Sequence, residues 1–363
     1  MIELILGSGD EGRKLGRYLE KLLPKAPRSF VFKALRQNKV RVDGKHAKEA
    51  ELVLHAGMKV TLYLTDEQLA EFGYHQTKKE PEAPYHHIPI LYEDENILAV
   101  CKPVGMLSQK STAKDVSLTE CMRQYLKDKG EWPEGTYEPA FVHRLDRNTE
   151  GVMLMAKTLQ AARALSEMIK ERQIDKIYLA AVSGQATIWK QETELKDFYR
   201  KDRKQNMASV EPYREKEEKT RLENGWEICR LKVRMIAQEK DASLLRVELL
   251  TGKSHQIRAQ LSHHGYPILA DGKYGGREKD GKTYSQMLLA AQIVFRECPE
   301  ALAYLREKHH GRNSRKLPTD FRKSDPIVKN HQTFIKGFEK REFVCYNKST
   351  IRFTDCRVPT DSL

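Results

Sequence analysis

One acidic residue of this chain, Asp146, stands between two arginines, Arg144 and Arg147, in the segment from residue 143 to residue 151. A short apolar run, residues 152–156, follows directly and predicts a buried strand with Asp146 near its entrance. A carboxylate with cationic neighbours stays ionised at neutral pH and can act as a nucleophile or as a base. An Asp–Arg pair that only stabilises a turn is the commoner use of such a segment, so the rest of the chain must decide between the two uses.

The composition favours a polyanionic partner. The chain has 363 residues, and its 64 Lys and Arg against 51 Asp and Glu give a net charge of +13. Nucleic acid is the first candidate partner for such a basic protein, although the charge could also serve solubility alone. The sequence has no apolar run of roughly eighteen residues and no secretory signal pattern at its start, so we expect no membrane span and a cytoplasmic location.

The cysteines and histidines do not have the spacing of metal ligands. The six cysteines contain no Cys-x-x-Cys pair, which argues against a zinc site and against a disulfide framework. Two adjacent histidine pairs, 86–87 and 263–264, lack the i, i+4 spacing that places two ligands on one helix face. We expect no metal.

Residues 1–65 have the pattern of a small α/β domain of their own. Leu15, Leu19 and Leu22 repeat at helical spacing, and a second short helix with basic residues follows. The alternating segment 39–42 then runs into Asp43-Gly44, a pair that suits the positive backbone angles of a type I′ hairpin turn.

A charged segment, residues 66–84, is interpreted as a linker to a larger domain at 85–300, and residues 301–363 form a basic, irregular extension. Strands and helices do not alternate strictly in the larger domain. This favours an α+β fold with a mostly antiparallel mixed sheet and flanking helices over a doubly wound one. The expected strands are 97–100, 176–182, 231–237, 243–250 and 288–295, and the expected helices are 116–128, 159–173 and 254–264.

Two nucleotide-binding motifs are incomplete. Residues 7–12 match a Gly-rich dinucleotide fingerprint, but Asp10 and Glu11 would place negative charge where a pyrophosphate must approach. We interpret this segment as a flexible lead into a helix. Thr251-Gly252-Lys253-Ser254 resembles the end of a P-loop, but Val247 stands where the first glycine is required.

Three further stretches, 97–106, 176–184 and 250–261, join the segment around Asp146. In this order and spacing, the four motifs resemble those of the RluA family of pseudouridine synthases, over about residues 85–297. Residues 12–64 resemble, more loosely, the S-four-type RNA-binding module that often precedes that catalytic domain. The departures are Glu150, where the family commonly has Ser, and Lys253, where it commonly has Arg.

The resemblance implies a pseudouridine synthase fold with a central cleft, no cofactor, and three catalytic residues: Asp146, Tyr178 and Arg258. Asp146 would attack the anomeric carbon of a uridine or assist proton removal from the sugar, and the sequence leaves both routes open. Tyr178 offers a ring and a hydroxyl to the displaced uracil, unless it is an ordinary core tyrosine. Arg258 would keep Asp146 charged, unless it is a surface cation. It is expected on a helix that begins near Ser254.

RNA contacts are expected at two places. Around the cleft, the resemblance implies that Arg144 fills the stack left by the extruded base, whereas His143 could be structural or functional. The full set of expected RNA-contact residues is His143, Arg144, Arg147, Thr149, Lys253, His255 and Gln256 around the cleft, and Arg17, Arg36, Lys39 and Arg41 on the first domain.

The expected activity is isomerisation of uridine to pseudouridine in structured RNA, most of all in large-subunit (23S) ribosomal RNA. Transfer RNA is the alternative substrate, and a non-catalytic RNA-binding or ribosome-assembly protein on the same scaffold is the alternative class. A monomer is expected. A protein freed from catalysis would have no physical reason to retain a charged aspartate opposite an arginine in a cleft.

Overall fold

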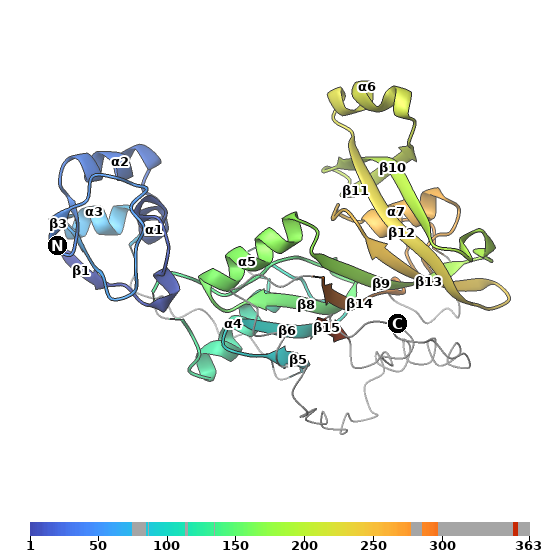
Figure 1. Ribbon diagram of the computed structural model, residues 1–363, viewed down its shortest axis with the longest axis horizontal. Coiled ribbons are helices and arrows are strands. Elements are labelled where there is room, and N and C mark those ends of the chain that lie inside the picture. The colour runs from blue at the N-terminus through green and yellow to red at the C-terminus, as the bar shows by residue number, and fades with distance from the viewer. Residues whose placement is uncertain are drawn as a thin grey trace.

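The computed structural model describes residues 1–74, 85, 87–112, 115–133, 135–276, 285–296 and 351–354. These residues form a four-stranded sheet near the N-terminus and an eleven-stranded sheet. The molecule is elongated, with the smaller sheet and its helices at one end and the larger sheet extending to the other (Figure 1). Within the described residues, no helix is long and apolar enough to cross a membrane.

The N-terminal module, residues 1–74, packs three helices against the smaller sheet. Its hairpin turn at Asp43 and Gly44 has φ angles of 49° and 76°, so both central residues are left-handed, as the Asp-Gly pair predicts. The strands, in sheet order, are β1 (Ile2–Ile5), β4 (Lys59–Leu62), β2 (Val40–Val42) and β3 (Lys45–His46); the helices are α1 (Leu15–Leu22), α2 (Arg28–Arg36), α3 (Asp66–Glu71) and the 3-10 turn η1 (Ser8–Asp10).

The predicted linker at 66–84 is wrong in its first half. Residues 66–71 form helix α3, which begins with a capping box between Thr65 and Gln68. The α3 side chain of Leu69 is buried in the core of the module, and Phe72 and Tyr74 pack against the same core. A charged surface hides this short amphipathic helix in the sequence. Residues 75–84 lie outside the described part of the chain.

The larger sheet is mixed and mostly antiparallel, which confirms the predicted α+β class. Its one parallel pairing among the described strands joins β8 to β14 near the middle of the sheet. The strands, in sheet order, are β11 (Met207–Pro212), β10 (Thr193–Asp202), β12 (Glu227–Gln238), β13 (Ala242–Leu249), β9 (Ile174–Ser183), β14 (Leu288–Phe295), β8 (Glu150–Ala156), β6 (Ile97–Lys102) and β5 (Ile90–Glu93), with β7 (Ala140–Phe141) beside β8 and β15 (Ile351–Thr354) beside β14.

Helices cover both faces of this sheet. Along β6, Ile97 and Ala99 pack in the cluster that contains α5, whereas Leu98 and Val100 pack in the cluster that contains α4. The period of two residues is that of a strand buried on both faces. The helices are α4 (Leu118–Asp128), α5 (Leu159–Lys170), α6 (Glu218–Glu223) and α7 (Gln256–His263), with the 3-10 turns η2 (Thr187–Trp189) and η3 (Glu215–Glu217).

Two parts of the larger sheet differ from the expectations. The long strands β10 and β11 were not predicted, because their sequence is charged and only part of it faces the core. In the predicted irregular extension, residues 351–354 pair antiparallel with β14. The remainder of 301–363 lies outside the described residues.

The module contacts the larger domain through the segment that we expected to be a flexible lead. The Asp10 carboxylate, 1% exposed, accepts hydrogen bonds from the Thr136 amide (2.9 Å) and hydroxyl (2.6 Å). The Arg163 guanidinium on α5 donates to the Gly12 carbonyl (2.6 Å), and Lys21 forms an ion pair with Glu138 (3.3 Å). The expectation of a flexible lead is therefore wrong: Asp10 is an anchor in a domain contact.

Candidate active site

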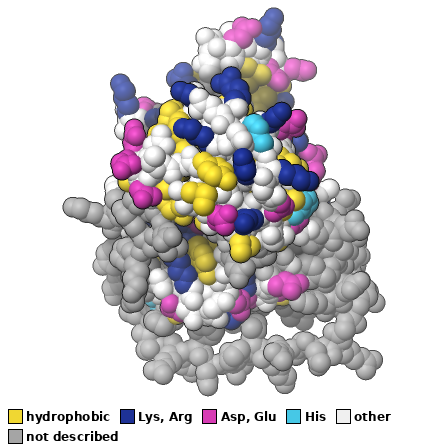
Figure 2. Space-filling model, turned by 90° about the vertical axis from the view of Figure 1, so that its left-hand side faces the viewer, with side chains coloured by type: hydrophobic (Ala, Val, Ile, Leu, Met, Phe, Trp, Pro, Cys, Tyr) yellow, Lys and Arg dark blue, Asp and Glu magenta, His cyan; other side chains and the backbone are white. Residues whose placement is uncertain are grey.

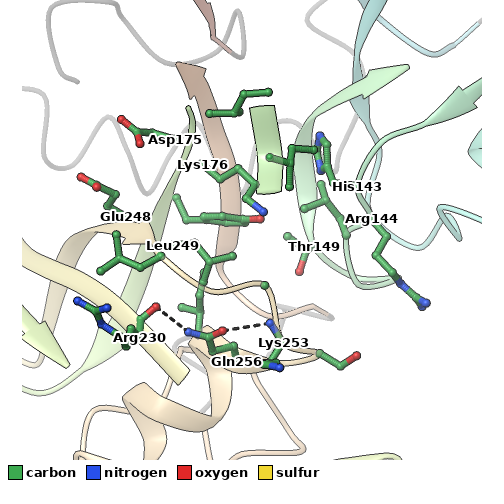
Figure 3. A pocket seen from close by; sticks show the side chains of 18 of the residues that line it. His143, Arg144, Thr149, Asp175, Lys176, Arg230, Glu248, Leu249, Lys253 and Gln256 are labelled. Carbon is green, nitrogen blue, oxygen red and sulfur yellow. Dashed lines mark hydrogen bonds between the residues drawn. The ribbon is translucent and has the colours of Figure 1, made fainter. Parts of the chain in front are cut away.

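A cavity of about 670 Å³ opens beside the middle of the larger sheet. This volume lies within the range of pockets that hold small ligands. Strand β9 contributes Tyr178 to the cavity, the segment before β8 contributes Asp146, and the segment before α7 contributes Lys253. Figure 3 shows the lining side chains converging from these separate elements.

The carboxylate of Asp146 contacts the guanidinium of Arg258, although the two residues are 112 positions apart in the sequence. Arg258 Nη1 donates to Asp146 Oδ2 at 3.0 Å, and the opposite edge of the guanidinium donates to Asp271 through Nε (2.7 Å) and Nη2 (2.8 Å). The side chains of Arg258 and Asp271 are 7% and 1% exposed, whereas Asp146 retains 27%. The arginine is thus fixed by a buried two-point contact and presents its remaining edge to a carboxylate that the cavity can reach.

Helix α7 places Arg258 at this position. Ile257 and Leu261 are buried in the main core, which confirms the predicted apolar pair at i, i+4. His255, just before the helix, has a left-handed backbone (φ 57°) that turns the chain into α7. The ring of His255 faces Tyr274 through a hydrogen bond between Nδ1 and the phenol oxygen (3.0 Å), and its Nε2 lies 4.0 Å from Asp146.

Burial and the two carboxylates set the charge state of the site. Burial opposes the charge of Arg258, but the hydrogen bonds and charges of Asp271 and Asp146 outweigh it and raise the arginine's pKa. Burial, followed by the charge of Asp146, raises the pKa of Tyr178, so its hydroxyl keeps its proton at neutral pH. Burial lowers the pKa of His255 to about 4, so this ring is neutral.

The turn that carries Asp146 is held by two buried side chains of neighbouring segments. Lys102 has no exposed surface and donates to the carbonyls of Pro103, Met106 and Arg147 at 2.9 to 3.0 Å. The Ser108 hydroxyl bridges both backbone groups of Leu145, donating to the carbonyl (2.8 Å) and accepting from the amide (3.0 Å). Both the backbone amide and the backbone carbonyl of the residue before Asp146 are therefore held by a side chain.

The arginines that flank Asp146 in the sequence are not its partners. Among the described residues, neither Arg144 nor Arg147 forms an ion pair with Asp146, and both are exposed. Arg147 instead donates from Nε to the Gly105 carbonyl (3.0 Å). The expectation that the flanking arginines are the charge partners of Asp146 is wrong, because the turn directs their side chains outward and Arg258 supplies the contact.

Most of the expected contact residues around the cleft line the cavity, but several have structural partners. The Thr149 hydroxyl accepts a hydrogen bond from Gln286 (2.7 Å). Gln256 is 2% exposed, and its side-chain amide holds the loop before α7. This amide accepts a hydrogen bond from the backbone N–H of Lys253 and donates one to the backbone carbonyl of Arg230, as the dashed lines in Figure 3 show. Arg147 is absent from the cavity lining. Gln256 and Arg147 thus have the contacts of residues that position loops.

His143 contributes a neutral ring to the cavity wall. The Leu154 amide donates to His143 Nε2 (3.2 Å), and burial, together with the nearby charge of Lys176, lowers the pKa of His143 to about 3. The single proton of the ring therefore resides on Nδ1. Within the described residues, this buried Nδ1 has no hydrogen-bond partner.

The expected RNA-contact residues of the module lie on its surface in mixed surroundings. Arg17 and Arg36 are exposed, and Arg17 pairs with Glu20 (2.9 Å). Lys39 and Arg41 are half-buried, with Arg41 stacked over the Tyr63 ring at 5.3 Å. The face in Figure 2 shows Lys and Arg side chains interspersed with acidic and hydrophobic ones, not gathered into one basic patch.

Comparison with known proteins assigns the family. A sequence model described as RNA pseudouridylate synthase matches residues 96–263. Ribosomal large subunit pseudouridine synthase C of Escherichia coli is 30% identical over 288 residues, which is 77% of this chain and 82% of that protein. This chain is a member of the RNA pseudouridylate synthase family.

Two further proteins are similar to this chain. An uncharacterised RNA pseudouridine synthase of Mycoplasma capricolum is 27% identical over 313 residues, covering 85% of this chain and 96% of that protein. Human RNA pseudouridylate synthase domain containing 1 superposes with a TM-score of 0.47 at 21% identity, over 61% of this chain and 84% of that one. The protein is an isomerase of the RluA family, which confirms the resemblance read from the four motifs.

Two residues that shape this synthase site were not singled out from the sequence. Asp271 lies 13 residues beyond Arg258, after the end of α7, and its only local signal is an acidic residue before Gly272. Lys102 lies at the end of an apolar strand, where a single lysine resembles a solvent-exposed strand end. Both are recognisable only from their buried partners.

Proposed function

We propose that this synthase isomerises uridine to pseudouridine in large-subunit ribosomal RNA, with Asp146 as the catalytic carboxylate. The single observation that carries the proposal is the Asp271–Arg258–Asp146 arrangement, in which a buried arginine–carboxylate pair presents the partly exposed Asp146 carboxylate to a cavity of nucleoside size. The substrate class is supported by the similarity to synthases named for the large ribosomal subunit.

The reaction breaks the C1′–N1 bond of uridine and forms a C1′–C5 bond, while the C5 proton leaves to solvent and N1 gains a proton. Asp146 acts on the sugar, either by attack on C1′ or by assisting proton removal. Arg258 orients the carboxylate, and the Tyr178 ring supports the detached uracil. No atom is gained or lost, so these steps need no cofactor.

The uridine must leave its stack to reach Asp146. Unstacking costs a few kcal/mol in a duplex, and the cost is smaller in a loop. Arg144, exposed at the cavity rim, is suited to fill the vacated space. We also propose that the module of residues 1–74 adds phosphate contacts through Arg17, Arg36, Lys39 and Arg41, and that the synthase acts as a cytoplasmic monomer.

Pseudouridine mapping in a strain that lacks this gene tests the proposal. One or more positions in large-subunit ribosomal RNA should lose pseudouridine. Wild-type protein should restore these positions, and Asp146→Asn should not. Loss of pseudouridine confined to transfer RNA would show that transfer RNA is the substrate instead. Restoration by Asp146→Asn would show that Asp146 is not the catalytic carboxylate.

A further inference from the structure

A second charged feature of the cavity lies on strand β9, two residues before Tyr178. Residues i and i+2 of a strand project from the same face and are separated by roughly 6.7 Å along it. Lys176 therefore enters the same cavity as Tyr178, and it is among the lining residues. In Figure 3 its side chain extends from β9 toward the side of the cavity where His143 lies.

The acidic side chains of this wall already have cationic partners. Asp175 accepts from Arg296 with both oxygens (2.8 Å each), Glu194 accepts from Arg230 (2.6 Å), and Glu248 lies 3.3 Å from Arg296. Lys176, in contrast, has neither an ion pair nor a hydrogen bond within the part of the chain that the structure describes. Burial lowers its pKa, as expected for an ammonium without an anion.

His143 adds a second donor without a partner. Because its Nε2 accepts the Leu154 amide hydrogen, the neutral ring offers Nδ1–H, a buried group without an acceptor among the described residues. The ammonium and the ring are close enough for the charge of Lys176 to lower the pKa of His143 further. Gly252 lies next to the ammonium, since a Cβ there would be in ordinary van der Waals contact with Lys176 Nζ, at 3.6 Å.

From this geometry we infer that Lys176 forms a subsite for a backbone phosphate of the substrate RNA, with the neutral ring of His143 beside it in the cavity wall and next to the nucleotide held over Tyr178. An ammonium without an anion in a cavity wall favours a charged acceptor over a neutral carbonyl. The inference rests on the proposed function, because it requires RNA to occupy the cavity.

The test compares wild type with Lys176→Gln and Lys176→Arg, and uses Lys190→Gln as a charge-matched control. Lys190 is exposed and does not line the cavity. The dissociation constant for an unmodified large-subunit ribosomal RNA transcript is measured at several KCl concentrations, with the single-turnover rate at saturating RNA and the thermal midpoint of each variant.

Loss of one phosphate contact should weaken binding by Lys176→Gln about tenfold at low salt and make its salt dependence shallower by about one unit of log Kd per log salt. The rate at saturating RNA should stay within about threefold of wild type, since binding energy shared by ground and transition states affects the Michaelis constant. Lys176→Arg should restore the salt slope, and Lys190→Gln should keep it.

A wild-type salt slope in Lys176→Gln, or an equal change in Lys190→Gln, would overturn the phosphate subsite. A slope that stays unchanged while the saturated rate collapses would also overturn it, because the amine would then act on the base or sugar. If the wild-type protein converts no uridine in this RNA, the proposed function fails instead, and that outcome is visible independently of the Lys176 variants.

Discussion

Arg258 is the residue through which the site is organised. Its guanidinium is shared between Asp271, which is buried, and Asp146, which faces the cavity. Removing one partner from a buried ion pair leaves an uncompensated charge, which commonly costs about 3 to 5 kcal/mol. Asp271 therefore affects both stability and the direction in which Arg258 points.

Asp271→Asn tests this positioning role. The variant keeps the shape but loses the charge, so we expect a loss of about 3 kcal/mol in the free energy of unfolding. We also expect a roughly 100-fold lower single-turnover rate at saturating RNA, because Arg258 no longer holds Asp146 in place. Asp241→Asn, at an exposed residue in the turn between β12 and β13, should leave both values unchanged. A wild-type rate in Asp271→Asn would contradict the role.

The histidines at the site predict how stability depends on pH. The pKa of His143 is lowered to about 3 and that of His255 to about 4. Between pH 6.5 and these values the unfolded chain binds protons that the folded chain does not, so stability present above pH 6.5 is lost as the pH falls. Each histidine should lower the free energy of unfolding by about 2 kcal/mol as the pH falls from 6.5 to 5.

Urea unfolding at pH 7 and pH 5 measures this effect. His143→Gln should lose about 2 kcal/mol less than wild type over this interval. His87→Gln, at an exposed histidine, should retain the wild-type dependence. An identical loss in wild type and His143→Gln would show that His143 is not held neutral.

At the scale of elements, the buried strands and α7 could be predicted, but the contacts between distant segments could not. Apolar runs identify β6, β8 and β14, and the spacing of Ile257 and Leu261 identifies the helix that carries Arg258. The partner Asp271 has no periodic signal, since it lies in a turn. Helix α3 was missed because four of its six residues are polar or charged and resemble a linker, although Thr65 and Gln68 form a capping box.

The parallel contact between β8 and β14 depends on one glycine. Gly151 has φ +125°, and a Cβ there would lie 2.1 Å from the Ala290 carbonyl oxygen. Gly151→Ala must therefore separate the two strands directly after the turn that carries Asp146, at a cost on the order of 3 kcal/mol or more.

Thermal and urea unfolding of Gly151→Ala test this close approach. The control is Gly272→Ala, at an exposed glycine with open space around it, which should change stability by less than about 0.5 kcal/mol. Equal stabilities for the two variants would show that the strands tolerate a side chain at residue 151.

At the scale of the whole molecule, the module and the larger domain meet through Asp10, Lys21 and Gly12. The module core includes Leu69 and Tyr74, so a truncation should start after residue 74. A truncated chain that starts at residue 66 would keep α3 without the core that covers Leu69, and we expect it to be less soluble than one that starts at residue 75.

The chain that starts at residue 75 tests the contribution of the module to RNA binding. Its affinity for the full-length ribosomal RNA should fall and its salt dependence should become shallower, because phosphate contacts of the module are lost. Turnover of a short stem-loop should survive, since the cavity lies in the larger domain. Unchanged affinity and salt slope would remove the module from RNA recognition.

The central claim is that the Asp146 carboxylate performs the chemistry, and release of the C5 hydrogen measures it most directly. Large-subunit ribosomal RNA labelled with tritium at uridine C5 is incubated with wild-type protein and with Asp146→Asn, after binding by both has been confirmed. Wild type should release tritium at the mapped positions, and Asp146→Asn should release none above background. Equal release by the two proteins would contradict the account.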